Sequence, residues 1–258
     1  MFQPVKVEAG FGPGEGYDMP PLLIRLQHDV EMELRGRIDR IDALEKEDKT
    51  YIRIVDYKSS EQKLDLSAVY YGLSLQMLTY LEAAIVHAPI WYEKEVHPAG
   101  MLYFHVHNPL IQADELKEDQ ITAEKIASYQ MKGYVTNELS VLQEMDEVLN
   151  EFGAKSHVVP VQLTKAGKLN AHSKVLAEDD MYVLMNHVSK KHEQAGNRMI
   201  EGDTRVYPYM YDGKKPCTFC NYRAVCQYDE TDPIYERRDL TKLDEKSALQ
   251  KMREERSN

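Results

Sequence analysis

Two aspartates face each other if two segments of alternating apolar and polar residues form a hairpin. Residues 30–42 and 51–58 have this alternation, and the polar turn 46–49 separates them. A turn centred between positions 47 and 48 places Asp39 opposite Asp56. Directly opposed side chains have Cβ atoms about 5 Å apart, so two carboxylates there require a cation between them. Hard oxygen ligands of this kind suit Mg²⁺ or Mn²⁺, which also bind phosphate oxygens.

The second segment of this hairpin ends with a lysine. Ile52, Ile54, Asp56 and Lys58 share one face of a strand because side chains alternate with period two. The face begins apolar and ends charged, as expected of a strand that leaves a core and enters a cleft. An exposed hairpin with surface ion pairs, for example between Asp56 and Arg37, is the alternative, and the spacing alone favours that alternative.

A helix must lie near this hairpin to complete a site. Apolar residues recur at three- and four-residue steps from Leu66 to about His87, which predicts an amphipathic helix that ends before Pro89. Gln76 and Tyr80 lie four residues apart on one face of this helix. An ordinary buried face explains Tyr80 almost as well, whereas a buried Gln76 amide would require hydrogen-bond partners.

Further elements are expected along the rest of the chain. Tyr103, His105 and His107 share one strand face, for which a solvated sheet edge is favoured over a metal site. The other expectations are a loop or extended lead-in at 1–21, a strand at 101–106, helices at 122–131 and 138–151, a strand at 157–163, a helix at 177–200, a short strand at 204–211 and a helical or frayed solvated tail at 236–258.

All three cysteines lie within ten residues near the end of the chain. Cys217, Cys220 and Cys226 have the spacing C-x₂-C-x₅-C, which indicates a metal site rather than a disulfide framework. Thiolates so close together suit a soft metal or an iron–sulfur cluster. A zinc site would recruit a histidine as fourth ligand, for example His187 or His192.

Length and charge limit the class of protein. The chain has 258 residues, 43% of them hydrophobic, and a formal net charge of −11, so overall charge does not attract nucleic acid. Any contact with DNA must therefore be local. No apolar run approaches 18 residues and the first 16 residues lack a signal-peptide pattern, so we expect a cytoplasmic protein with no membrane contact.

Three segments together resemble a known family. Gly-Arg-Ile-Asp-Arg-Ile-Asp at 36–42, Val-Asp-Tyr-Lys-Ser-Ser at 55–60 and Gly-Leu-Ser-Leu-Gln-Met-Leu-Thr-Tyr-Leu at 72–81 resemble the PD-(D/E)XK nucleases of the RecB type. The chain is most similar to the C-terminal nuclease domain of the AddB subunit of bacterial ATP-dependent helicase/nucleases (AddAB), over nearly its whole length. The resemblance implies an α/β fold of restriction-endonuclease type, with a central mixed sheet flanked by helices.

The resemblance also assigns roles to the hairpin residues. It implies that Asp39, Asp56 and the backbone carbonyl of Tyr57 hold the metal. It implies that Lys58 orients or polarises the attacking water and offsets charge on the phosphate, as in metal-assisted hydrolysis. In this family the motif Gln-x-x-x-Tyr, matched by Gln76 and Tyr80, faces the active site and the DNA.

The cysteine loop, 214–228, has a counterpart in the same family. AddB-type nucleases hold a [4Fe–4S] cluster with one cysteine far upstream and three near the C-terminus, which match Cys217, Cys220 and Cys226. The upstream cysteine is absent from this chain, so we expect an N-terminally truncated fragment whose cluster is incomplete or missing. The expected organisation is a nuclease domain at 1–235 and a charged tail at 236–258.

The function implied is that of a magnesium-dependent DNA exonuclease domain. It would belong to a heterodimer with an AddA-type helicase/nuclease subunit that processes double-strand breaks for recombinational repair, and it would hydrolyse the unwound 5′-terminated strand. No phosphate-cradling G-x-x-x-x-G-K-[ST] segment is present, so the ATP motor is expected in another subunit. The alternatives are a stand-alone RecB-like exonuclease of CRISPR-adaptation type and a catalytically silent module that clamps DNA or a partner.

Overall fold

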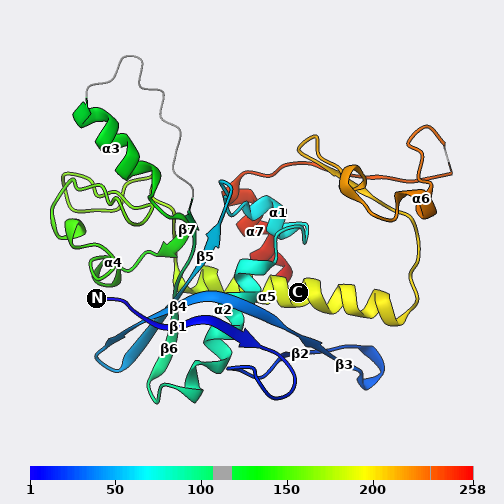
Figure 1. The fold of residues 1–258 in the computed structure, drawn as a ribbon, viewed down its shortest axis with the longest axis horizontal. Helices are drawn as coiled ribbons and strands as arrows, with labels where there is room; N and C mark the ends of the chain where they lie inside the picture. The colour runs from blue at the N-terminus through cyan, green and yellow to red at the C-terminus, as the bar shows by residue number, and fades with distance from the viewer. Residues whose placement is uncertain (107–117, 233, 258) are drawn as a thin grey trace.

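A six-stranded mixed sheet lies at the centre of the computed structural model, which describes residues 1–106, 118–232 and 234–257 (Figure 1). The strand order is β1-β4-β5-β6-β7-β8, and β5 pairs with β6 in parallel, as β7 does with β8. The strands are β1 (Gln3–Phe11), β4 (Gly36–Lys46), β5 (Lys49–Lys58), β6 (Glu95–His105), β7 (Lys132–Thr136) and β8 (Val175–Leu176). The expected α/β class with a central mixed sheet is confirmed.

The hairpin of β4 and β5 has the register predicted from the sequence. Its backbone pairs run from Arg40 opposite Val55 to Lys46 opposite Lys49. Glu47 adopts a left-handed backbone conformation with φ of 53°, which allows the tight turn between the strands. The aspartates therefore lie where the hairpin opens, just beyond the last of these pairs.

Strand β5 is central and is covered on both faces. Ile52 and Ile54 pack into one hydrophobic core, whereas Tyr51 and Val55 pack into the other. This arrangement explains the nearly continuous burial of the strand, which ends only at the exposed Tyr57 side chain.

Four helices pack against the first of these cores, on the face of β5 to which Asp56 belongs. They are α1 (Leu66–Tyr70), α2 (Gln76–His87), α5 (Glu178–Ile200) and α7 (Glu245–Ser257). The second core is closed by α4 (Leu139–Leu142), the short helix η3 (Glu147–Asn150) and an irregular segment that contributes Val159, Val161 and Leu163. Helix α3 (Glu118–Ser128) precedes β7 on this side of the molecule (Figure 1).

The helix predicted over 66–87 is broken into α1 and α2. Gly72 has a φ of +79°, and its N–H donates to the carbonyl of Val69. The N–H of Leu73 donates to the carbonyl of Ala68. These two bonds form a Schellman motif, which ends α1 at a left-handed glycine. The break lets α2 start in a new direction, with Gln76 in its first turn.

Several other expectations were wrong in type or extent. Within the loop or extended lead-in expected at 1–21, residues 3–11 are extended but form edge strand β1 on β4, because backbone pairing overrides the break expected at Gly10. Residues 157–163 form only isolated bridges, the helix expected at 138–151 is reduced to α4 and η3, and the strand expected at 204–211 is limited to β9 (Tyr209–Tyr211). The long helix expected at 177–200 is confirmed as α5.

The C-terminal segment is held to the body of the molecule. Strand β10 (Arg238–Leu240) pairs in parallel with β9, and helix α7 follows. Ala248 and Met252 of α7 are buried against α1 and α5. The expected helix is therefore confirmed, but the expectation that it is solvated is wrong, because its apolar stripe belongs to the first core.

The remaining elements are short. Strands β2 (Leu22–Arg25) and β3 (Glu31–Leu34) form a separate hairpin around η1 (Gln27–Asp29), η2 covers Ala88–Ile90, and the cysteine loop contains η4 (Pro216–Phe219) and α6 (Arg223–Cys226). Within the described ranges, no helix is both long and apolar enough to cross a membrane.

Candidate active site at the open end of the hairpin

The two aspartates lie on neighbouring strands at the open end of the hairpin. Asp56 is on β5 and is 3% exposed, whereas Asp39 on β4 is half-buried. Asp39 Oδ2 accepts a hydrogen bond of 2.8 Å from the backbone N–H of Tyr57. The carboxylate of Asp39 on β4 is therefore fixed to β5, the strand that carries Asp56.

The Asp56 carboxyl is electrostatically unusual. Burial raises its pKa, the Lys58 ammonium lowers it, and the Asp39 carboxylate raises it. Lys58 Nζ lies 2.5 Å from Asp56 Oδ2 as an ion pair. Apart from this ion pair, the buried Oδ2 has no hydrogen-bond partner within the described ranges. A buried carboxylate next to a second carboxylate is a favourable position for a cation.

A polar chain runs from Lys58 to the helix above the sheet. Lys58 Nζ donates to Gln76 Oε1 at 3.4 Å, and Gln76 Nε2 donates to the hydroxyl of Tyr80 at 3.1 Å. The predicted pair on α2 thus faces the hairpin site. Gln76 is exposed rather than buried, so its amide is partnered by the lysine and the tyrosine and not by the core.

Tyr80 is held by aromatic packing near the start of β4. Its ring contacts Phe11 edge-on with a centroid distance of 5.9 Å. A Cβ atom at Gly36 would lie 2.7 Å from the Phe11 ring and 2.9 Å from the Tyr80 ring. Glycine is therefore required at position 36 by the close approach of these rings.

Tyr103 is a residue of this site that the sequence interpretation missed. It pairs with Asp56 across β5 and β6, and Lys58 Nζ lies 5.9 Å from the centre of its ring. Burial, followed by the Asp56 charge, raises the pKa of Tyr103 to about 12. The expectation of a solvated sheet edge was wrong because β7 pairs with β6 on this side of the sheet. His107, which was expected on the same strand face as Tyr103, lies outside the described residues. The unbroken apolar run from Met101 to Phe104, which is typical of a strand covered on both faces, was the available signal.

A buried ion group lies on the opposite face of the same hairpin. Asp42 is fully buried and accepts bonds from Arg40 Nε at 2.6 Å and Arg53 Nε at 2.9 Å. The Arg53 guanidinium also stacks 4.6 Å from the centre of the Phe2 ring. These contacts join β4 to β5 on the face opposite the aspartates.

The donors at the hairpin suit a cation that keeps its own waters. Among the described residues, no group of three or more His, Cys, Asp or Glu side chains gathers to hold a metal. Mg²⁺ needs only one or two carboxylates together with water and phosphate oxygens. Asp39 and Asp56, whose buried Oδ2 has Lys58 as its one polar contact among the described residues, therefore fit Mg²⁺ or Mn²⁺.

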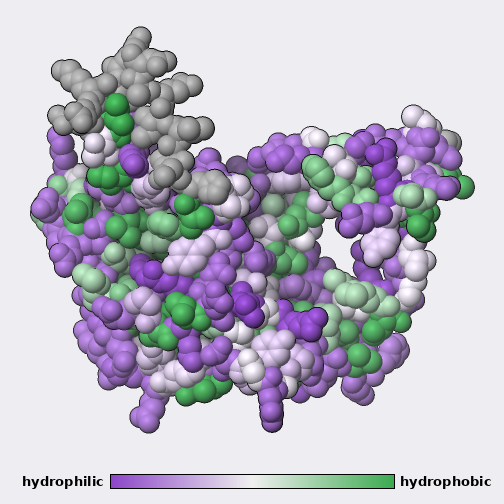
Figure 2. Space-filling view, in the orientation of Figure 1, coloured by the Kyte–Doolittle hydropathy of each residue, from purple (hydrophilic) through white to green (hydrophobic). Residues whose placement is uncertain are grey.

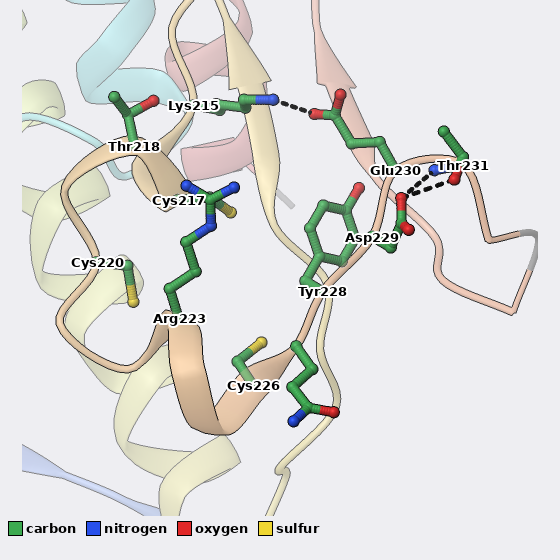
Figure 3. A pocket seen from close by; sticks show the side chains of 11 residues that line it. Lys215, Cys217, Thr218, Cys220, Arg223, Cys226, Tyr228, Asp229, Glu230 and Thr231 are labelled. Atoms are coloured by element: carbon green, nitrogen blue, oxygen red, sulfur yellow. Dashed lines mark hydrogen bonds and ion pairs between the residues drawn. The ribbon is translucent and has the colours of Figure 1, made fainter.

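The cysteine loop stands apart from this site. Cys217, Cys220 and Cys226 line one pocket of about 580 Å³, also lined by Arg223 and Tyr228 (Figure 3). The thiols are free and do not come together as a ligand set in the part of the chain that the structure describes. This geometry does not fit a cluster.

The loop is attached to the body at its base. The hydroxyl of Tyr211 donates to Asp65 Oδ2 at 2.7 Å, while Asp65 Oδ1 accepts from the N–H groups at the start of α1. Figure 2 shows the loop extending from the body with an opening between them. None of the three thiols belongs to either hydrophobic core.

Comparison with known proteins agrees with this geometry. The model of the PD-(D/E)XK nuclease superfamily matches residues 1–227. Proteins described as the B subunit of ATP-dependent helicase/deoxyribonuclease are 41% identical to this chain in Lysinibacillus sphaericus, over 256 residues, and in Bacillus pumilus and Bacillus licheniformis, over 255 residues.

Each match covers 98% of this chain but only 22% of the relative. The chain thus spans about a fifth of the length of these relatives, and the matched region includes the hairpin, α2 and the cysteine loop. On the extent of the family match and the identity to these relatives, the chain belongs to the PD-(D/E)XK nuclease superfamily.

Proposed function

We propose that this chain is a metal-dependent deoxyribonuclease domain whose active site is the open end of the β4–β5 hairpin. The observation that carries the proposal is the contact of Lys58 with a buried Asp56 carboxylate, next to Asp39, in a chain of this family. A bound divalent cation would supply a nucleophile near neutral pH and would stabilise charge on the phosphate. Asp39 and Asp56 would hold it, with the backbone carbonyl of Tyr57 as a third donor.

The protein's own groups orient the reaction. Lys58 carries the positive charge that offsets charge developing on the phosphate. Gln76 holds the ammonium by accepting from Nζ, and Tyr80 holds Gln76 in turn. Gln76 and Tyr80 are thus positioning residues for Lys58. In this proposal the start of α2, which carries both residues, also lies near the incoming DNA.

We further propose that the domain works within a larger helicase/nuclease. The relatives are described as the B subunit of an ATP-dependent helicase/deoxyribonuclease. We infer a partner of AddA type that unwinds a broken duplex, and an unwound 5′-terminated strand as substrate, in the processing of double-strand breaks. The similarity to these subunits favours this assignment over a stand-alone exonuclease of CRISPR-adaptation type.

The decisive experiment is cleavage of end-labelled single-stranded DNA by the purified chain with Mg²⁺ or Mn²⁺. We expect cleavage that EDTA abolishes, that Lys58→Ala removes, and that Lys251→Ala retains. Lys251 is a suitable control because it is exposed on α7 and does not line the pocket beside Lys58. Cleavage by Lys58→Ala at the wild-type rate would refute the assigned site, and DNA binding without cleavage under any condition would favour the silent clamping module.

A further inference from the structure

A second pocket opens beside Lys58 on the face of the sheet that carries Asp56. Its volume is about 220 Å³, and its walls include Lys58, Tyr103, His105 and Lys132. Asp56 pairs with Tyr103 across β5 and β6, and Tyr103 pairs with Lys132 across β6 and β7. Directly paired residues point to the same face, so the pocket continues the active-site surface towards β7.

The charges of this pocket favour an anion. Lys132 is half-buried, and its side chain has no hydrogen bond or ion pair with any described residue. Glu61 is the one acidic residue among the described residues that line the pocket, and Lys63 pairs with it at 3.7 Å. The ammonium groups of Lys58 and Lys132 therefore line one small pocket, and among the described residues the ammonium of Lys132 has no anionic partner. An external anion would supply that partner.

The wall next to Lys132 is built before any ligand arrives. Gln130 Nε2 donates to the carbonyl of Ser156 at 2.7 Å and to that of Val159 at 3.0 Å. These bonds fix the start of β7 to the irregular segment that closes the second core. Because this wall is already ordered, little conformational entropy is lost in fixing the backbone of Lys132 when a ligand binds.

We propose that this pocket binds the phosphate next to the scissile phosphate of a DNA strand, with Lys132 as the residue that positions it; the inference rests on the proposed nuclease function. Strands β5 and β7 are two strand spacings, about 10 Å, apart. The side chains of Lys58 and Lys132 nevertheless line the same pocket. A strand whose scissile phosphate lies at Asp56 would place its neighbouring phosphate in that pocket.

The first test measures binding of a fluorescein-labelled oligothymidylate in EDTA by anisotropy, as a function of salt concentration. Removing one phosphate contact lowers the magnitude of the salt slope for single-stranded DNA by about 0.7. We expect this change for Lys132→Met, with affinity reduced about tenfold, as for the loss of one charged hydrogen bond. Lys132→Arg should restore both values, and the exposed Lys125→Met should resemble the wild type.

The second test neutralises one phosphate at a time with a methylphosphonate and measures KM and kcat for cleavage. In the wild type, one substitution next to the scissile bond should raise KM about tenfold. In Lys132→Met the same methylphosphonate should not raise KM further, because the contact between the lysine and that phosphate is already lost. The two changes together form a double-mutant cycle that isolates this contact. Additive effects at every position, or an unchanged salt slope for Lys132→Met, would overturn this inference and leave the nuclease proposal intact. A wild type that binds with the Lys132-dependent slope but does not cleave would contradict the nuclease proposal, and would leave Lys132 as a phosphate contact without a scissile neighbour.

Discussion

Asp39 accepts a hydrogen bond of 2.8 Å from the backbone N–H of Tyr57, so this side chain supplies both an acceptor for the fold and a negative charge for the site. The two contributions can be separated by substitution. Asn retains an acceptor oxygen but has no charge, whereas Ala has neither.

We expect Asp39→Asn to lower the metal-dependent cleavage rate at least about 100-fold while keeping the thermal stability of the wild type. Asp39→Ala should lose the same activity and also about 1 kcal/mol of stability, because the N–H of Tyr57 loses its partner. Cleavage assays and thermal unfolding in EDTA measure the two effects. Equal stability of the two variants would mean that the hydrogen bond contributes nothing to the fold.

A second prediction concerns Gln76, which joins Lys58 to Tyr80. Because Gln76 is exposed, Gln76→Ala should leave the free energy of unfolding within about 0.5 kcal/mol of the wild type. Its kcat should fall about 10- to 100-fold, as for other residues that orient a catalytic group. Tyr80→Phe, which removes only the hydroxyl that accepts from Gln76, should have a smaller effect on kcat. A change in KM alone for Gln76→Ala would instead place the amide on the DNA.

The site shows which information the sequence contained. The alternation of β4 and β5 about a two-residue turn fixed their register, and this was enough to bring Asp39, Asp56 and Lys58 to one end of the hairpin. The same period-two argument failed for Tyr103, because burial of a strand depends on its neighbours in the sheet. The pairing of β6 with β7 is a contact between distant segments, and no local pattern specifies it.

The helices illustrate the same limit. Apolar spacing continued through residues 66–87, yet the left-handed Gly72 ends α1 and redirects the chain. Gly72 was a visible signal for a helix end, and it was outweighed by the periodicity around it. Lys132 had no sequence signal at all, since only the assembled sheet places it on the face of Asp56.

Glu82 on α2 leads to a prediction about pH. Burial raises the pKa of Glu82 to about 7, and its carboxyl group has no hydrogen bond or ion pair among the described residues. Between pH 4.5 and about 7, the folded state therefore keeps a proton on Glu82 that the unfolded state, with a pKa of 4.5, has released. The stability from this proton is fully present below pH 4.5 and is lost as pH rises through about 7.

Glu82→Gln should consequently be more stable than the wild type by about 3 kcal/mol at pH 8, and the difference should vanish near pH 4.5. Urea unfolding of both proteins across this range measures the difference directly, so the titration of other groups cancels. A difference that does not change with pH would show that Glu82 is charged in the folded protein throughout.

Asp42 gives a prediction about the back of the hairpin. It is fully buried between Arg40 and Arg53, and the side chain of Arg53 is itself 7% exposed. Asp42→Ala leaves a buried guanidinium without its partner and should cost about 3–5 kcal/mol. The double variant Asp42→Leu with Arg53→Met should recover most of this loss, as unfolding in urea would reveal. A single variant as stable as the wild type would mean that Arg53 finds water or another partner.

Helix α7 provides the last prediction, because the charge alternation of its sequence conceals an apolar stripe. Met252 is 1% exposed and lies in the core shared with α1 and α5, whereas Lys251 beside it is exposed. Met252→Ala should cost about 2–5 kcal/mol through lost burial and the cavity that remains. Lys251→Ala, on the same helix, should stay within about 0.5 kcal/mol of the wild type. Similar, small effects of both substitutions on the midpoint of thermal unfolding would show that α7 detaches before the core unfolds, and the segment would then behave as the solvated tail that its sequence suggests.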